Sequence, residues 1–385
     1  MEKVKLKDIA TINGTTFRTN GFDEILYLDT SSVTKGVFGD FMHLSKNDKI
    51  PSRAKRAVKN NTIVYSTVRP NLEHLGIFSE PKENVVVSTG FATIDVNEKK
   101  TEPKFVYYNL TQSKFTNALH TIATNNVSSY PSINPSDLEN LEITLPPLPT
   151  QKSISSVLSL LDDKIELNRN INAELEALAR TLYEWYFVQN RKKEWKVEKL
   201  GEILKFEKGS EPGSSAYSDT QENENFVKFY RVGDIDGNCN TWVDKTAHDL
   251  VFVKPDDVVV TFDGSVGKMG IGLEGAISGG LQKISDPTDK FSNALIWLIF
   301  SDAKIVATIE QYATGSVLKH ASGAIKYLEL PIPDTTTLSA FSKVVKPIFA
   351  QIVQNRQQSA ELAKLRDFLL PMLMNGEVVV KYPAN

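Results

Sequence analysis

Residues 145–171 read LPPLPTQKSISSVLSLLDDKIELNRNI, and this stretch determines the fold. Proline interrupts the segment before it and is well tolerated in the first turn of a helix, so a helix is expected to follow. Beyond the prolines, apolar residues recur at spacings of mostly four and three, which predicts a long helix packed along a partner helix. The predicted contact stripe consists of Ile154, Leu158, Leu161, Ile165, Asn168, Ile171, Leu175, Leu178, Leu182 and Trp185.

A second helix of the same kind is predicted after residues 330–333, which read LPIP. One asparagine interrupts each stripe, Asn168 in the first helix and Asn355 in the second. A polar residue on such a stripe fixes the register of a helix pair at some cost in stability, so the two asparagines are expected to lie together. The second predicted stripe consists of Phe341, Val345, Ile348, Ile352, Asn355, Leu362, Leu365, Leu369 and Met372.

The chain contains one pattern twice, in the same order and at similar spacing. The two copies are about 190 residues apart. A single period of that length predicts a duplicated module with a pseudo-twofold arrangement, because solenoid repeats are far shorter. The corresponding pairs are residues 5–9 and 199–203, 61–65 and 257–261, 76–77 and 270–271, 123–124 and 313–314, and 145–149 and 330–333.

Before each proline-rich segment, short apolar runs alternate with Gly, Asn, Pro and Ser clusters, which is typical of short strands. The predicted fold class is therefore α+β: two similar domains separated by two long antiparallel helices that form a coiled coil, with a pseudo-twofold internal repeat. The expected boundaries are a first domain at 1–150, a central helix at 151–193, a second domain at 194–333, a C-terminal helix at 334–376 and a tail at 377–385.

Periodicity alone leaves two interpretations of the helices open. They form either a plain hairpin that holds two domains together or a spacer that holds two similar heads at a set distance. The second suits a ligand with two similar sites, and DNA half-sites about 34–36 Å apart are of this scale.

Composition is that of an ordinary globular protein: 385 residues, 41% apolar, with 44 basic and 47 acidic side chains and a formal charge of −3. This balance gives no polybasic tail. The single cysteine, Cys239, excludes an internal disulfide and a cysteine-based zinc cluster and fits a reducing compartment. No apolar run is long enough for a membrane span and no signal peptide is evident, so we expect a cytoplasmic protein.

Sequence motifs for catalysis are missing. There is no P-loop, no H-E-x-x-H zinc motif, no G-x-S-x-G nucleophile elbow, no G-x-G-x-x-G dinucleotide loop and no adenine-methylation tetrapeptide. The five histidines never occur at a spacing that one metal ion could use. We therefore expect no catalytic residue, no metal site and no cofactor in this chain.

Three segments, residues 145–151, 160–170 and 365–377, resemble the specificity subunits of type I restriction–modification systems. The resemblance implies a non-catalytic subunit whose two target-recognition domains each read half of an interrupted site in double-stranded DNA, while the paired helices set the gap. It also implies partners: two adenine methyltransferase subunits that use S-adenosylmethionine, and a restriction subunit that translocates DNA with ATP and Mg²⁺.

Side chains that can contact bases or phosphates gather in loops of both predicted heads. Arg69 and Asn71 suit guanine and adenine, although an exposed turn is the ordinary alternative; residues 124–130 could equally be a polar turn. Arg231 could equally form a salt bridge with nearby carboxylates. The candidates are Arg53, Lys55, Arg56, Arg69, Asn71, Asn125, Asn126 and Ser128 in the first head, and Arg231, Ser265, Lys268, Ser316 and Lys319 in the second.

Loop sequences and charge differ between the heads. Different loops imply different half-sites and thus an asymmetric target. Residues 194–333 carry 14 basic and 21 acidic side chains, so we expect the isolated chain to bind DNA weakly and the assembled complex to bind it tightly. Two alternatives remain: a two-headed coiled-coil scaffold that binds a protein partner, and an autonomous nuclease or methyltransferase.

Overall fold

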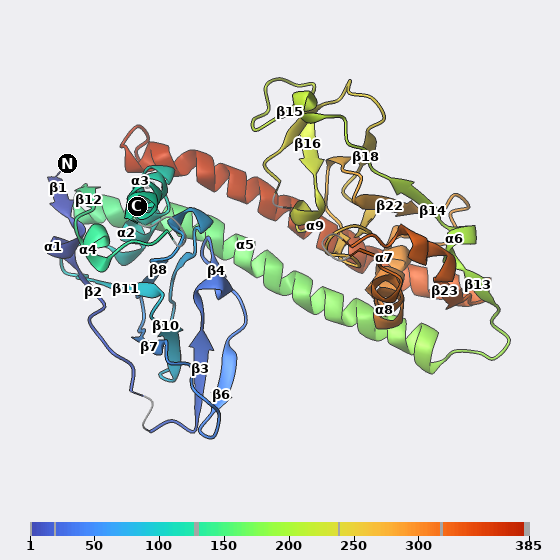
Figure 1. Cartoon of the computed structure of the whole chain (residues 1–385), viewed down its shortest axis with the longest axis horizontal. Coiled ribbons are helices and arrows are strands. Elements are labelled where there is room, and N and C mark those ends of the chain that lie inside the picture. Colours follow the sequence, from blue (N-terminus) through green and yellow to red (C-terminus); the bar gives the residue numbers. More distant parts are fainter. Residues whose placement is uncertain (1, 19–20, 127–130, 238, 316–318, 381–385) are drawn as a thin grey trace, which may run out of the picture. The chain divides into compact units, whose positions relative to one another are not determined.

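A computed structural model describes residues 2–18, 21–126, 131–237, 239–315 and 319–380. The chain has the α+β architecture expected, with two long helices, α5 (Leu148–Tyr183) and α9 (Thr335–Met374), drawn green and red in Figure 1. It divides into two compact units: unit 1 comprises Met1–Asp163 and Ala363–Asn385, and unit 2 comprises Lys164–Leu362. Each unit thus contains one globular head and a segment of both long helices.

Unit 1 contains two four-stranded sheets, with strand orders β2-β11-β8-β9 and β6-β3-β10-β7, and the antiparallel pair β1-β12. All pairings in the two larger sheets are antiparallel except β3 with β10, which is parallel. The strands are β1 (Glu2–Lys5), β2 (Ala10–Ile12), β3 (Glu24–Leu28), β4 (Val33–Thr34), β5 (Val37–Phe38), β6 (Met42–Ser45), β7 (Ala54–Ala57), β8 (Ile63–Ser66), β9 (Leu75–Ile77), β10 (Val85–Ser88), β11 (Phe91–Val96) and β12 (Glu142–Leu145).

Strand β8 shows why these sheets are buried on both faces. Successive side chains of a strand point to opposite faces, so Ile63 and Tyr65 enter one apolar cluster while Val64 enters another. The first cluster is closed by helices, which include the almost wholly buried α2, and proline begins α2 where its missing N–H is not needed. The helices of this head are α1 (Leu6–Ile9), α2 (Pro103–Leu110), α3 (Ser113–Asn126) and α4 (Pro135–Glu139), with a short 3-10 turn η2 at Pro70–Leu72.

Unit 2 repeats this arrangement. Its sheets have the orders β14-β22-β19-β20 and β15-β17-β16-β21-β18, and its two-stranded pair is β13-β23. The parallel pairing recurs between β16 and β21. The strands are β13 (Val197–Lys199), β14 (Lys205–Lys208), β15 (Tyr217–Ser218), β16 (Phe226–Tyr230), β17 (Trp242–Asp244), β18 (Val251–Val253), β19 (Val258–Thr261), β20 (Met269–Gly270), β21 (Gly275–Ile277), β22 (Leu281–Ser285) and β23 (Glu329–Pro331).

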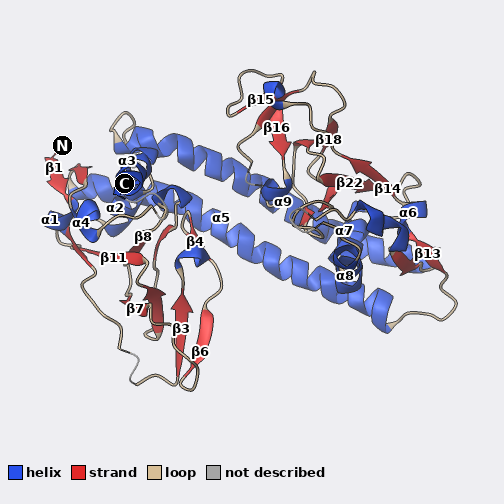
Figure 2. Cartoon of the chain, viewed as in Figure 1, coloured by secondary structure: helices blue, strands red, loops and turns tan. Residues whose placement is uncertain are grey.

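The same alternation builds the core of unit 2: Val258 and Val260 of β19 enter one cluster and Val259 enters another. Figure 2 shows the strands of each head in red and the long helices in blue. The helices of this head are α6 (Leu200–Ile203), α7 (Asn293–Ser301) and α8 (Ala303–Gln311), with 3-10 turns that include η5 (Val232–Asp234) and η6 (Ser322–Tyr327). Because strand order, pairing sense and helix order recur, the internal repeat predicted from sequence is present in the fold.

Helix α5, which continues as a π-helical turn η3 (Glu184–Gln189), carries an unbroken heptad stripe. The predicted stripe is correct as far as Asn168 and again at Leu175 and Leu182, but it is one residue off at Ile171, Leu178 and Trp185, where Asn172, Ala179 and Tyr186 lie on the stripe. Leu178 and Trp185, predicted to face a partner, are 49% and 51% exposed, and this part of the prediction was wrong. The stripe of buried and half-buried residues is Gln151, Ile154, Leu158, Leu161, Ile165, Asn168, Asn172, Leu175, Ala179, Leu182 and Tyr186.

Helix α9 follows the same rule, and Pro347 does not end it. Leu365 was predicted on the stripe but is 44% exposed, and the half-buried Arg366 occupies that position instead. Met372 was likewise one residue off, because the buried Leu373 lies on the stripe. The α9 stripe is Leu338, Phe341, Val345, Ile348, Ile352, Asn355, Ser359, Leu362, Arg366, Leu369 and Leu373.

None of the helices in the described part of the chain has the length and apolar character that a membrane span requires.

Buried amides join the two helices within unit 2. Asn355 donates from Nδ2 to Asn172 Oδ1 at 2.8 Å, and Asn172 donates to the carbonyl of Ile352 at 3.2 Å. Asn168 Nδ2 lies 3.4 Å from the carbonyl oxygen of Asn355 and 2.9 Å from Gln358 Oε1. Asn168 contacts Gln358, whereas Asn172, further along α5, contacts Ile352, which is earlier in α9. The two helix segments therefore run antiparallel. The structure therefore brings Asn168 and Asn355 together and adds Asn172, which the sequence analysis missed.

Candidate nucleic-acid interface

One edge of the unit 1 head gathers several of the candidate residues. The turn after β8 is held to the segment before α4, because Arg69 N–H donates to the carbonyl of Pro131 at 2.8 Å and Ile133 N–H donates to Thr67 at 2.9 Å. Thr67 N–H in turn donates to Gly90 at 2.8 Å. These backbone bonds fix the place of the turn regardless of its side chains.

Arg53 joins the same edge, since Thr89 N–H donates to its carbonyl at 2.8 Å and Thr89 directly precedes Gly90. The side chains of Arg53, Arg69 and Asn71 are all exposed. Guanidinium and amide groups at one exposed edge can reach base edges and phosphates of a duplex.

Strand β7 separates its two basic candidates. Lys55 is exposed, whereas Arg56 is half-buried on the face that Ala54 directs toward a small apolar cluster. The Nε atom of Arg56 is buried without a hydrogen-bond partner among the described residues. Lys55 is thus available for phosphate contact, while much of the Arg56 side chain supports the strand.

The corresponding edge of unit 2 has the same backbone frame. Gly264 N–H donates to Lys319 at 2.8 Å, Ala321 N–H donates to Phe262 at 2.7 Å, and Phe262 N–H donates to Gly280 at 3.0 Å. His320 Nδ1 lies 2.8 Å from Asp263 Oδ1, which adds a side-chain link between the loops. Gly264 therefore occupies the position that Arg69 occupies in unit 1.

Ser265, Lys268 and Lys319 are exposed at this edge. The turn that carries the first two is fixed by Thr261, whose Oγ1 accepts from Lys268 N–H at 2.9 Å and donates to the carbonyl of Ser265. Compact ammonium groups on such a turn suit phosphate oxygens better than base edges, because they lack the planar fork of a guanidinium.

Arg231, at the end of β16, lies with its guanidinium carbon 4.9 Å from the centre of the Tyr217 ring. Burial, together with a hydrogen bond to Glu211, raises the pKa of Tyr217 to about 12 and keeps this ring neutral beside the cation. Gly280 lies close to Val232 and Asp263, so the residue that follows Arg231 reaches the same edge. Stacking on tyrosine holds the planar group in position.

Four candidates of the donor-rich loops fall outside this picture. Thr124, Asn125 and Asn126 form the last turn of α3, so the loop predicted at 124–130 was wrong for these three residues. Asn125 is exposed on that turn. The side chain of Asn126, together with Ser128 and Ser316, lies outside the described residues.

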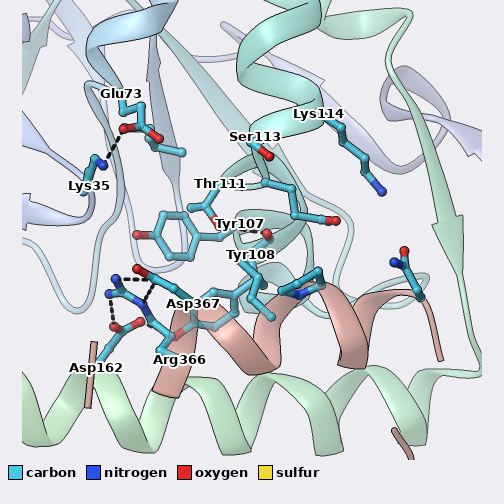
Figure 3. A pocket seen from close by; sticks show the side chains of 15 residues that line it. Lys35, Glu73, Tyr107, Tyr108, Thr111, Ser113, Lys114, Asp162, Arg366 and Asp367 are labelled. Atoms are coloured by element: carbon cyan, nitrogen blue, oxygen red, sulfur yellow. Dashed lines mark hydrogen bonds and ion pairs between the residues drawn. The ribbon is translucent and has the colours of Figure 1, made fainter. Parts of the chain in front are cut away.

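Unit 1 also contains a cavity of about 430 Å³ between its head and the end of α9. Figure 3 shows Arg366 joined by dashed lines to Asp162 and Asp367, at 2.7 and 2.8 Å. Tyr108 donates to Asp162 at 2.6 Å, and burial raises the pKa of its hydroxyl above the ordinary value. These contacts link α2, α5 and α9 within unit 1.

Within the described parts of the chain, no group of three or more His, Cys, Asp or Glu side chains is arranged to hold a metal ion.

The family model for the type I restriction modification DNA specificity domain matches residues 1–177 and again residues 192–363. The chain belongs to this family. Each matched range contains one of the two heads that the strand orders define and continues into one of the long helices. Membership does not favour the alternative of a protein-binding scaffold.

Relatives in the specificity family match along nearly their full lengths. The type I restriction enzyme HindI specificity subunit of Haemophilus influenzae is 22% identical, with 98% of this chain and 99% of the relative covered. A putative type I restriction enzyme MjaX specificity subunit of Methanocaldococcus jannaschii is 26% identical, with 98% and 93% covered. The crystal structure of a type I restriction–modification S subunit from M. genitalium has the same fold, with a TM-score of 0.56, 16% identity and coverage of 99% and 96%.

Sequence reasoning missed the residues that join the loops of each specificity domain. Gly90 and Gly280 accept the bonds that anchor the turns after β8 and β19, and an added Cβ would contact Thr30 at 2.7 Å or Val232 at 2.6 Å. The sequence did contain a signal: both copies have a glycine directly before the corresponding strand, Gly90 before β11 and Gly280 before β22. Its meaning, close approach of a neighbouring backbone, is visible only once the chain has folded.

Proposed function

We propose that this specificity subunit reads a bipartite, asymmetric site in double-stranded DNA, with one half read by each head. The observation that supports this most strongly is the repeated edge: the same backbone bonds hold a turn after β8 and after β19, and the two turns carry different side chains. A constant frame with variable donors is the arrangement that direct readout of two different half-sites needs.

The first target-recognition domain in this proposal is residues 1–150 and the second is residues 194–333. The candidates for DNA contact are the exposed residues of the two edges. Helices at 151–193 and 334–376 act as the spacer that sets the gap, and the amides of Asn168 and Asn355 fix their register.

An insertion of four residues in both helices, about 6 Å, should change the tolerated gap by one or two base pairs without changing either half-site. An unchanged gap would show that the helices do not measure it.

The subunit works without chemistry of its own in this proposal. It docks two methyltransferase subunits, which use S-adenosylmethionine, and a restriction subunit, which uses ATP and Mg²⁺, in the cytoplasm. Family membership supports the assembly, and the missing catalytic motifs support the division of labour. Much of the positive surface for the phosphates then comes from the partners, because the second head is itself acidic.

The test is to produce the chain with its cognate methyltransferase subunits and sequence the DNA for modified adenines. We expect one interrupted, asymmetric motif, and no methylation by the chain or the methyltransferase alone. Methylation that is independent of this chain would refute the proposal, as would two identical half-sites. Cleavage or methylation by the purified chain alone would show that it is an enzyme.

A further inference from the structure

The reading turns of the two heads have the same backbone shape and different residues. Arg69 N–H bonds the carbonyl of Pro131, and Gly264 N–H bonds the carbonyl of Lys319, both at 2.8 Å. Both residues are left-handed, with φ of +49° at Arg69 and +70° at Gly264. The turn thus requires a positive φ at this position in either head.

Glycine adopts this conformation freely, whereas a side chain with a Cβ does so at a cost in free energy. The cost is greater at Arg69, because Pro70 follows it and a residue before proline prefers extended backbone. Pro70 is itself buried at the start of η2. Unit 1 therefore holds an arginine where the fold would be satisfied better by glycine.

A second residue of the same turn is also left-handed. Glu73 has φ of +52° where the unit 2 turn has Gly267 at +80°. Its carboxylate pairs with Lys35 Nζ at 2.7 Å, and its carbonyl accepts from Lys35 N–H at 2.9 Å. The Glu73 side chain thus binds the turn to the rest of the head.

The side chain of Arg69 is exposed, at the edge that also carries Arg53 and Asn71. Strain at a residue of this kind is retained where the side chain has a function. The forked guanidinium can donate two hydrogen bonds to O6 and N7 of guanine, which the ammonium group of a lysine reproduces poorly.

We infer that Arg69 is a specificity-determining residue of the first half-site and reads a guanine, and that its strained backbone is retained for this purpose. This inference rests on the proposed function. Unit 2 has no side chain at the equivalent position, so its reading turn depends on neighbours such as Ser265 and Lys268.

The test compares Arg69→Gly, Arg69→Lys and the unchanged chain, each assembled with the methyltransferase subunits. Methylation is measured on a duplex library randomised in both half-sites. We expect the unchanged complex to require a guanine at one position of the first half-site, and both variants to reduce that preference by about 5- to 150-fold. The second half-site should be read as before in all three complexes.

The urea midpoint of each chain gives a readout that does not depend on DNA. Arg69→Gly removes the strain and should leave the midpoint unchanged or higher, whereas Gly264→Ala, the matched change in unit 2, should lower it and leave the first half-site intact. A lower midpoint for Arg69→Gly would contradict the strain.

An unchanged guanine preference in Arg69→Gly would overturn the inference while leaving the proposed function in place. A preference kept by Arg69→Lys and lost by Arg69→Gly would also overturn it, since a charge alone would then suffice. If the unchanged complex shows no sequence preference, the proposed function itself has failed.

Discussion

The two units solve one structural problem with different residues. Both hold the turn after β8 or β19 with the same pair of backbone bonds, but unit 1 places Arg69 and Glu73 at the left-handed positions and unit 2 places Gly264 and Gly267 there. Backbone bonding can be duplicated without constraining side chains. The scaffold of such a pair can therefore stay constant while its recognition residues diverge.

The helix segments of the two units differ in a similar way. At a stripe position of unit 1, Arg366 pairs with Asp162, and Tyr108 donates to the same carboxylate. In unit 2 three polar stripe positions, Asn168, Asn172 and Asn355, hold amides, and Asn355 donates to Asn172. Charged and neutral polar contacts in a partly dry seam differ in what their removal leaves behind, so they should respond differently to mutation.

Asp162→Ala should have the largest effect, a loss of about 3 kcal/mol of unfolding free energy. Removal of the carboxylate leaves the half-buried Arg366 with only Asp367, and leaves the Tyr108 hydroxyl without its acceptor. Urea unfolding measures the loss, and Asp163→Ala, one residue along on an exposed position, is the control. Equal losses in the two variants would show that the cluster does not stabilise unit 1.

Asn355→Ala should cost less, about 2 kcal/mol, because only neutral groups lose partners. Asn172 Oδ1 would be left buried without its donor, and Gln351 would lose its acceptor at 2.8 Å. Gln354→Ala, exposed on the neighbouring face of α9, is the control in the same urea experiment. The contrast between the two seams disappears if Asn355→Ala costs as much as Asp162→Ala.

Most of the fold could be predicted from the sequence, because the long helices follow from the spacing of apolar residues and the two heads follow from the internal repeat. The helix stripes, the repeat and the proline-marked helix starts all have local causes. The stripe prediction was wrong where the residue on the stripe is polar and its neighbour is apolar. Ile171 was predicted although Asn172 lies on the stripe, and Leu365 was predicted although Arg366 does. Apolar character alone selects the wrong residue at such points, because a seam also accepts polar residues that find partners across it.

The interface was less predictable, because φ angles and loop contacts have no local signature. Nothing in Thr67-Val68-Arg69-Pro70 marks Arg69 as left-handed; Pro70 and Asn71 after it suggest only a turn. Thr124 to Asn126 show the opposite problem, since polar residues that favour turns form the end of a helix. The exposed candidates on the two edges remain predictions for DNA contact.

Lys319→Ala should have a smaller effect, seen in DNA binding rather than in folding. Removal of one phosphate contact should lower the slope of log affinity against log salt by about one, equally for all sequences. Lys304→Ala, exposed on α8, is the control. Unit 1 has Pro131 at the matching position, so Pro131→Lys should raise the slope by about one. A change of sequence preference in Lys319→Ala would mean that this lysine reads a base.

The smallest effect is expected where the long helices begin. Helix α5 starts after Pro147 with no acidic residue in its first turn, whereas Asp334 precedes α9, accepts from Thr337 N–H at 2.9 Å and pairs with Lys192 at 2.9 Å. The hydrogen bond with Lys192 and that from Thr337 hold the pKa of Asp334 well below its ordinary value.

A carboxyl group whose pKa is lowered in the folded state stabilises the fold at pH values above its unfolded pKa, near 4. This stabilisation is lost as the pH falls toward the folded pKa. Asp334→Asn should therefore lower the urea midpoint slightly at pH 7, and the difference from the unchanged chain should narrow steadily between pH 5 and pH 3.5. A difference that does not depend on pH would show that the charge of Asp334 contributes nothing and that the two helix starts differ only in hydrogen bonding.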